Sequence, residues 1–171
     1  IENDIHVHEL PESWDNDNNK AFKSGCDALG IPVKRLKINI KDCRQQGFCN
    51  LGCTAGAKQG TLEVQIPQAL QQGVELIHNA WVEYVAADHV SFRIRAARQG
   101  TEPNTHKEGL YKVKMNDVIL AAGALQTPGI LLRSKKHLGL RSGLPIGNYL
   151  TLHPAVNING VHREVLKNYR G

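Results

Sequence analysis

The segment that most constrains this chain lies between residues 118 and 128, where an apolar run is followed by very small residues and a Thr-Pro pair. Residues 118–122 carry no polar side chain, which suits a strand buried on both faces. Gly123 would end that strand, and Thr127 and Pro128 are typical of the N-cap and the first residue of a helix. We therefore expect a strand–turn–helix unit of the kind found in α/β proteins.

The turn of this unit is suited to a ligand that comes close to the backbone. Ala121, Ala122, Gly123 and Ala124 have almost no side chains. A flat ligand can approach such a segment, and the free N–H groups at a helix start suit a phosphate. Tight packing between strand and helix would explain the same small residues, so both interpretations stay open.

The rest of the chain predicts a mixture of helices and short strands. Expected helices lie at 20–29 and 61–72, and expected strands at 74–85, 90–98, 111–115 and 155–161. The first three of these strands follow one another closely and would form an antiparallel β-meander over residues 74–116. Residues 1–19 are polar and are expected to be irregular. The predicted fold class is α/β (α+β mixed).

Three of the four cysteines, Cys43, Cys49 and Cys53, lie in one short glycine-containing segment. Thiolates at this spacing can hold an iron–sulfur cluster, or zinc with a fourth ligand. A disulfide between two of them is a third interpretation, and three reduced, buried cysteines in a tight loop are a fourth. Four cysteines are too few for a fold built on disulfides.

Composition and missing motifs exclude several classes of protein. The net charge is only +5, and no apolar run approaches the roughly 20 residues of a membrane helix, so no membrane span is expected. Aromatic residues make up 5%, too few to stack many bases, and we expect no nucleic-acid partner. Ala57 separates Gly56 from Lys58, which rules out a Walker loop, and no Gly-x-Gly-x-x-Gly or serine nucleophile elbow is present.

Four segments, in this order, resemble the glucose–methanol–choline (GMC) oxidoreductases, flavoproteins that oxidise alcohols with FAD. The segments are 43–58, 74–82, 119–132 and 147–154. Residues 123–134, Gly-Ala-Leu-Gln-Thr-Pro-Gly-Ile-Leu-Leu-Arg-Ser, are similar to the second signature of that family. The signature continues with Gly, where this chain has Lys135.

The resemblance implies which residues meet the cofactor. The strand through Asn79 would lie beside the adenine end of FAD and bind it mainly through backbone groups, and the strand–helix turn would approach it from the next unit. The implied cofactor-binding residues are Asn79, Ala80, Val82, Ala122, Gly123, Ala124, Thr127 and Pro128.

The resemblance also implies a domain organisation. Residues 1–144 would be the later part of an FAD-binding, Rossmann-like domain that includes the Cys-rich loop 43–53 and the β-meander. Residues 145–171 would begin a substrate-binding domain. The family's pyrophosphate loop and catalytic histidine would lie outside the chain, which is therefore expected to be incomplete at both ends and inactive alone. No catalytic residue is assigned within it.

The implied reaction oxidises the CH–OH group of an alcohol, sugar or polyol by hydride transfer to flavin. The implied partners are a small-molecule alcohol, the remainder of the same polypeptide and an electron-acceptor subunit. The cysteine spacing also resembles that of flavoprotein subunits that pass electrons through an iron–sulfur cluster, which Cys43, Cys49 and Cys53 would hold. A cytoplasmic location is favoured, and association with a membrane complex is left open.

Two other functions are compatible with these residues. One is a binding module without catalysis, stabilised by a metal or an iron–sulfur cluster at the three cysteines. The other is a nucleic-acid-binding domain that uses the basic clusters of the chain. A glycine-rich phosphate loop upstream and a catalytic histidine downstream would favour the flavoenzyme over both.

Overall fold

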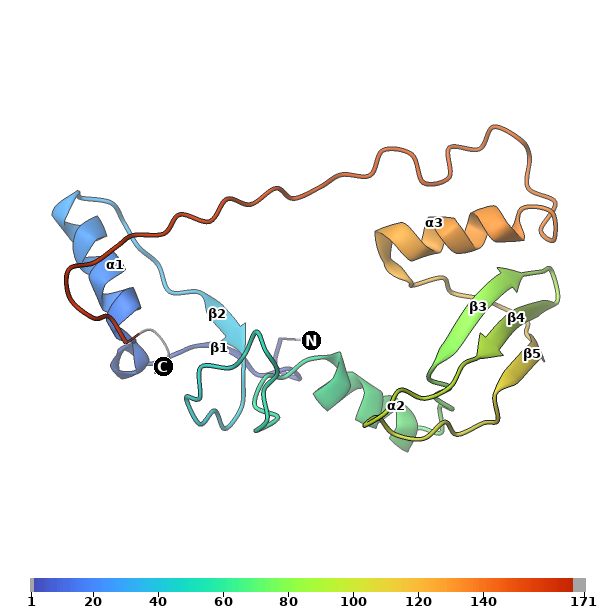
Figure 1. Cartoon of the computed structure of the whole chain (residues 1–171), viewed down its shortest axis with the longest axis horizontal. Coiled ribbons are helices and arrows are strands. Elements are labelled where there is room, and N and C mark those ends of the chain that lie inside the picture. The colour runs from blue at the N-terminus through green and yellow to red at the C-terminus, as the bar shows by residue number, and fades with distance from the viewer. Residues whose placement is uncertain (1, 168–171) are drawn as a thin grey trace. The chain divides into compact units, whose positions relative to one another are not determined.

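The helices and strands fall into two units, which are described one at a time. The computed structural model describes residues 2–167. Residues up to Glu75, with those from Asn157 on, form the first unit, and Leu76–Val156 form the second. The first unit contains β1 (Val7–Glu9), the 3₁₀ helix η1 (Glu12–Trp14), α1 (Asp17–Ala28), β2 (Lys37–Asn39), the π-helix η2 (Thr61–Gln65) and α2 (Ile66–Gln71) (Figure 1). The second contains β3 (Ala80–Val85), β4 (His89–Ile94), β5 (Gly109–Lys114) and α3 (Gly123–Ser134).

The first unit confirms a helix in the predicted place and corrects the segment before it. The side chain of Asn16 accepts a hydrogen bond from the backbone N–H of Asn19 at 2.9 Å, which caps the start of α1. Gly30 follows the helix with φ +68°, the left-handed conformation common after a helix end. The prediction of irregular structure over 1–19 was wrong, because β1 pairs there with β2 in antiparallel register. A pairing between distant segments leaves no local signal.

The helix predicted at 61–72 is confirmed, with a change of type inside it. Its first five residues form the wider π-helix η2, and α2 follows from Ile66. Pro67 lies at the start of α2, where a missing N–H costs little. Gly73, with φ +85°, follows the helix end.

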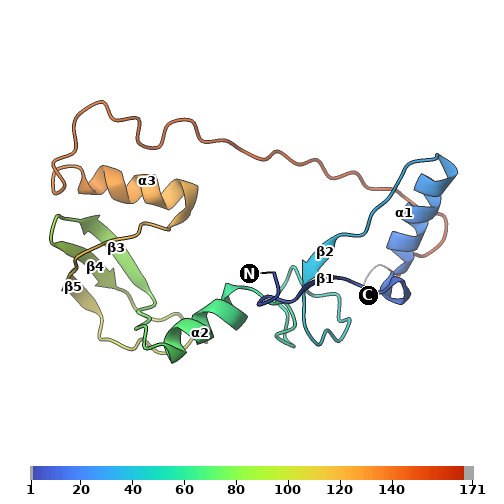
Figure 2. The same cartoon turned by 180° about the vertical axis from the view of Figure 1, so that it is seen from behind.

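The second unit contains the predicted β-meander. Its strands lie in the order β3-β4-β5, and both neighbouring pairs are antiparallel (Figure 2). The first strand is shorter than predicted, since residues 74–79 are not part of it. Asn79, with φ +54°, breaks the extended conformation directly before β3. Between Val82 and Tyr84 the register with β4 shifts, so Glu83 forms a β-bulge.

Helix α3 covers the free edge of β3 through two side chains. Arg133 donates from Nε to the Glu83 carbonyl at 2.9 Å and from Nη2 to the Val82 carbonyl at 3.1 Å. The hydroxyl of Ser134 accepts from the Val85 N–H at 2.8 Å and donates to the Ile130 carbonyl at 2.7 Å. Ser134 is fully buried. Backbone groups that would be unpaired at a sheet edge therefore bond to the helix.

The strand–turn–helix unit differs from its prediction in two respects. Residues 118–122 form no strand, and Ile119 is 91% exposed, because no described strand pairs with this segment. Helix α3 begins at Gly123, earlier than the predicted start at Thr127 and Pro128. The Thr127 hydroxyl instead accepts from the backbone N–H of Ala122 at 3.1 Å, and Pro128 lies inside the helix. Thr127 thus caps the N–H at the start of α3 from a position inside the first two turns of that helix.

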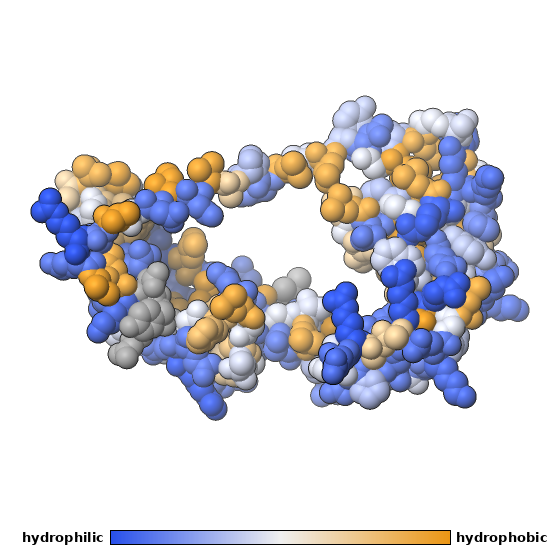
Figure 3. All heavy atoms as spheres, viewed as in Figure 1, coloured by the Kyte–Doolittle hydropathy of each residue, from blue (hydrophilic) through white to orange (hydrophobic). Residues whose placement is uncertain are grey.

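The last predicted strand, at 155–161, is also absent from the structure. Val156, Ile158 and Val161 are exposed, so the apolar side chains of this stretch have nothing to pack on within the described residues. Figure 3 shows that hydrophobic residues are common on the surface of the chain. Alternation of polar and apolar residues predicts a strand only where a neighbouring strand supplies hydrogen bonds.

Replacing Ser134 with Ala should destabilise the second unit. The variant leaves the buried Val85 N–H without its acceptor, a change that costs about 1–3 kcal/mol of unfolding free energy. Chemical denaturation followed by tryptophan fluorescence measures the difference. The matched control is Ser142→Ala at an exposed loop position, which should stay within about 0.5 kcal/mol of the parent. Equal effects in the two variants would contradict the role given to Ser134.

Candidate functional site

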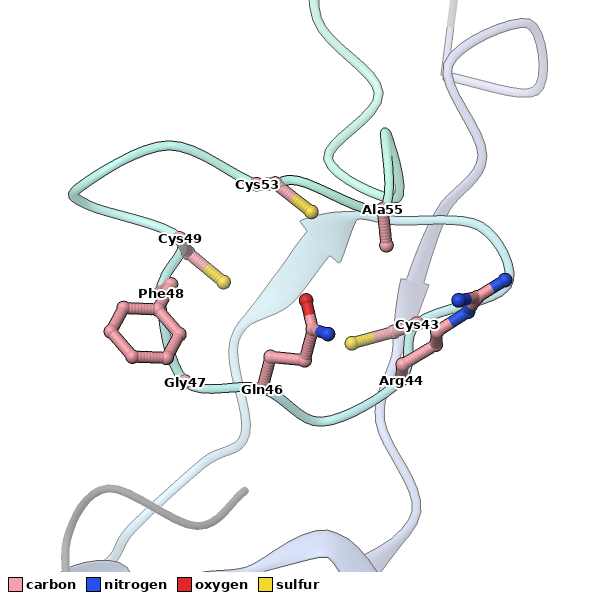
Figure 4. Close-up of a pocket in the computed structure, with 8 residues that line it drawn as sticks. All are labelled: Cys43, Arg44, Gln46, Gly47, Phe48, Cys49, Cys53 and Ala55. Atoms are coloured by element: carbon pink, nitrogen blue, oxygen red, sulfur yellow. The ribbon is translucent and has the colours of Figure 1, made fainter.

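The three clustered cysteines line one small hollow. Figure 4 shows the sulfurs of Cys43, Cys49 and Cys53 pointing into the interior of the loop that carries them. The hollow is about 20 Å³ in volume, and its other lining residues are Arg44, Gln46, Gly47, Phe48 and Ala55. All three thiols are free, Cys49 is exposed and the other two are half-buried. Three cysteines close together in the sequence thus line one hollow.

Backbone groups stabilise negative charge on the sulfur of Cys53. Hydrogen bonds from the backbone of Lys58, and then of Ala57, lower the pKa of this thiol. Burial acts against them, and the backbone of Ala55 adds a smaller contribution that lowers the pKa. The net pKa lies below the ordinary value of a cysteine, so the folded loop favours the thiolate.

Cys43 and Gln46 have partners of their own inside the loop. The sulfur of Cys43 accepts a hydrogen bond from the backbone N–H of Gln45 at 3.3 Å. The side-chain oxygen of Gln46 accepts from the Thr54 hydroxyl at 3.1 Å. In Figure 4 the Gln46 amide extends into the hollow on the side of Cys43.

The described residues contain no group of three His, Cys, Asp or Glu side chains that could hold a metal ion. The iron–sulfur cluster predicted at Cys43, Cys49 and Cys53 thus gains no support from the geometry of the loop. It stays a prediction from the spacing.

The predicted cofactor turn is open to solvent. Ala122, Gly123 and Ala124 are exposed, and Gly123 has φ +78°. A Cβ added at Gly123 would meet no atom within 4 Å, so the backbone there has free space beside it. Thr127 and Pro128 are half-buried, and a Cβ added at Gly147 would lie 3.3 Å from the Cβ of Pro128. The turn at Gly123 has no protein atoms beside it, whereas the helix that follows packs at Pro128 against the loop at Gly147.

The predicted residues of β3 lie at its free edge. Arg95 donates its backbone N–H to the Asn79 carbonyl at 3.0 Å, which continues the ladder with β4 by one residue. Because hydrogen-bonded and non-bonded positions alternate in an antiparallel pair, the backbone groups of Ala80 and Val82 point away from β4. The Val82 carbonyl is bonded to Arg133. The backbone N–H and C=O groups of Ala80 therefore point toward the free edge of β3.

A second hollow of about 260 Å³ adjoins the start of β3. Its lining residues are Asn79, Ala80, Trp81, Arg95, Ala96 and Arg98. The Arg95 guanidinium lies 4.5 Å from the centre of the Trp81 ring, a cation–π contact. The Asn79 amide donates to the Asn104 side chain at 2.7 Å. Sequence reasoning named two of the lining residues and missed the pairing of Arg95 with Trp81, which the cross-strand register could have revealed.

The structure links the two predicted cofactor segments through α3. The turn lies at the first residue of the helix, and Arg133, ten residues later, contacts Val82 of β3. At 1.5 Å per residue the two points are about 15 Å apart along the helix.

Comparison with known proteins identifies the family. Residues 1–155 match the family model described as GMC oxidoreductase. The chain belongs to the GMC oxidoreductase family. The resemblance noted for the four sequence segments is therefore confirmed.

The relatives of this GMC oxidoreductase chain are much longer proteins. It is 34% identical to a long-chain-alcohol oxidase of Arabidopsis thaliana over 142 residues, which cover 81% of the chain and 18% of that protein. An uncharacterized GMC-type oxidoreductase of Sinorhizobium fredii is 29% identical, over 84% of the chain and 27% of its own length. One of Mycobacterium tuberculosis is 29% identical, over 99% of the chain and 25% of its own length. No solved structure gives a significant match.

Among the described residues, no helix is both long enough and apolar enough to cross a bilayer.

Alkylation of Cys53 should depend on pH differently in the folded and the unfolded chain. Because the folded loop lowers the pKa of this thiol, more of it is thiolate below the unfolded-state pKa. The pH midpoint of its reaction with iodoacetamide should thus be lower in the native protein than in urea. Mass spectrometry of the peptide that contains Cys53 measures both midpoints. A native midpoint equal to or above that in urea would contradict the stabilising role of the backbone N–H groups.

Proposed function

We propose that the chain is part of an FAD-dependent oxidoreductase that oxidises the CH–OH group of an alcohol, sugar or polyol. The observation that carries the proposal is the match of residues 1–155 to the GMC oxidoreductase family. The name of the plant relative, a long-chain-alcohol oxidase, supports an alcohol as the donor. The chain spans between 18% and 27% of the three relatives named above, so the reaction belongs to a longer protein of this kind.

The turn at the start of α3 fits a cofactor held by backbone groups. Ala122, Gly123 and Ala124 leave the first N–H groups of the helix exposed, and the space beside Gly123 is empty of protein atoms. Such N–H groups carry the partial positive charge of a helix start, which favours an anionic or electron-rich ligand. These residues would hold FAD by close approach, with Thr127 and Pro128 fixing the helix that presents them.

The edge of β3 supplies a second set of contacts. Ala80 and Val82 direct backbone groups away from β4, and Asn79 adjoins the hollow beside Trp81. These groups would orient the adenine end of FAD. When bound, the flavin supplies the acceptor for the hydride removed from the alcohol.

The family resemblance also supports a proposal for how the longer protein is divided into domains. Residues 1–144 would belong to the FAD-binding domain and residues 145–171 to the start of the substrate-binding domain. The group that takes the alcohol proton, and the electron-acceptor subunit if one is used, would come from outside this chain. An iron–sulfur cluster is left out of the proposal, because the described residues offer no set of three ligands for a metal ion.

A glycine substitution at the turn should reduce FAD binding. Gly123→Ala places a methyl group beside the turn and strains a residue at φ +78°. In the natural protein we expect FAD retention to fall at least about tenfold, equivalent to about 1.4 kcal/mol. Flavin absorbance after gel filtration, and titration of the apoprotein with FAD, measure the loss.

The matched control is Gly139→Ala, which imposes a similar strain at φ +60° with equally open space, five residues beyond the other end of α3. It should keep its flavin. Equal loss in the two variants would show that the turn has no special role in binding. A natural protein that purifies without FAD, and that FAD cannot reconstitute, would overturn the proposed function itself.

A further inference from the structure

We propose that Cys49 and Cys53 form a thiol-oxidation site, at which hydrogen peroxide converts the two thiols into a disulfide. The site lies wholly within the Cys-rich loop 43–53, and the proposal does not depend on the proposed function. It rests on the convergence of the thiols on one hollow, on the accessibility of Cys49 and on the shape of the turn between them.

The chain between the two cysteines already forms a tight turn. The Phe48 carbonyl accepts hydrogen bonds from the N–H groups of Leu51 and Gly52, each at 3.0 Å. The hydrogen-bonded turn runs from Phe48 to Gly52 and keeps the chain between the two cysteines compact. Gly52, with φ +124°, changes the direction of the chain directly before Cys53. Figure 4 shows the Cys49 and Cys53 side chains pointing into the same hollow.

Cys49 is a better partner for Cys53 than Cys43 is. A disulfide from Cys49 closes the shortest loop available, which costs the least entropy. The sulfur of Cys43 is held by the Gln45 N–H, and the Gln46 side chain, bonded to Thr54, occupies the hollow on its side. Cys49 is exposed and has no such restraint among the hydrogen bonds of the described loop.

The chemistry balances without any other co-reactant. The Cys53 thiolate attacks one oxygen of hydrogen peroxide, the O–O bond breaks, and the departing hydroxide takes up a proton to become water. The Cys49 sulfur then attacks the sulfenic acid on Cys53, the S–O bond breaks, and a second water leaves with the proton of Cys49. The two sulfurs together lose two electrons, and the peroxide gains them. The N–H groups around Cys53 favour it as the first nucleophile.

Trypsin separates the possible disulfides cleanly. Cleavage after Lys41, Arg44 and Lys58 places Cys43 in the peptide 42–44, and places Cys49 and Cys53 together in 45–58. The native protein is treated with a small excess of peroxide, quenched, unfolded in an alkylating reagent and digested. We expect peptide 45–58 to become lighter by two hydrogen atoms and to lose both alkyl groups, and a reductant should restore them.

The chain contains its own reference thiol and allows a matched set of variants. Cys26 is buried in α1 and falls in the peptide 24–34, which should stay alkylated at the same peroxide dose. Cys49→Ser and Cys53→Ser should each lose the oxidised peptide. Cys43→Ser should keep it.

Three results would overturn the proposal. The first is a cross-linked product of peptides 42–44 and 45–58, because it would show that Cys43 is the partner. The second is oxidation of Cys49 or Cys53 only to sulfinic or sulfonic acid, and the third is full alkylation of peptide 45–58 at the dose that oxidises Cys26. The parent protein alone decides between these outcomes, so the test does not depend on how well the variants fold.

Discussion

The hydrogen bonds between the end of α3 and the free edge of β3 determine how the second unit is built. Arg133 and Ser134 reach backbone groups about 50 residues earlier in the chain, and Ser134 does so from a fully buried position. Because a buried N–H without a partner is costly, the helix is held at this edge. The other end of the same helix carries the small-residue turn. The position of the candidate cofactor turn relative to the sheet is therefore set by two side chains that do not take part in it.

Local signals predicted the elements that depend on local physics. The sequence predicted the β-meander and a helix over 20–29, and the structure contains both. Predictions for segments whose structure depends on a distant partner were wrong in two ways: one strand was missed, and strands were predicted where none forms. β1 was missed because its partner β2 lies some 30 residues away, and residues 118–122 and 155–161 were given strands that nothing in the described chain pairs with.

The candidate site shows the same division. The spacing of the three cysteines left four interpretations open, and the structure adds that the three residues line one hollow. The small residues of the turn at Gly123 were compatible with a bound ligand or with tight packing, and the structure shows free space beside Gly123. The start of α3 did not follow, because Thr127 satisfies the Ala122 N–H from inside the helix and not from the usual capping position. The contact of Arg133 with β3 could not have been predicted from the residues around Arg133 alone, because its partners lie about 50 residues earlier in the chain.

The β-bulge at Glu83 has a consequence for how this unit can vary. In a regular strand, successive carbonyls point to opposite sides, so one guanidinium could not bond to two of them in a row. The bulge places the carbonyls of Val82 and Glu83 within reach of Arg133 together. The Glu83 side chain makes only a partly exposed ion pair with Arg93, of small energetic worth. Position 83 should thus accept many amino acids, yet its deletion would remove the bulge and one of the two hydrogen bonds that Arg133 makes to β3.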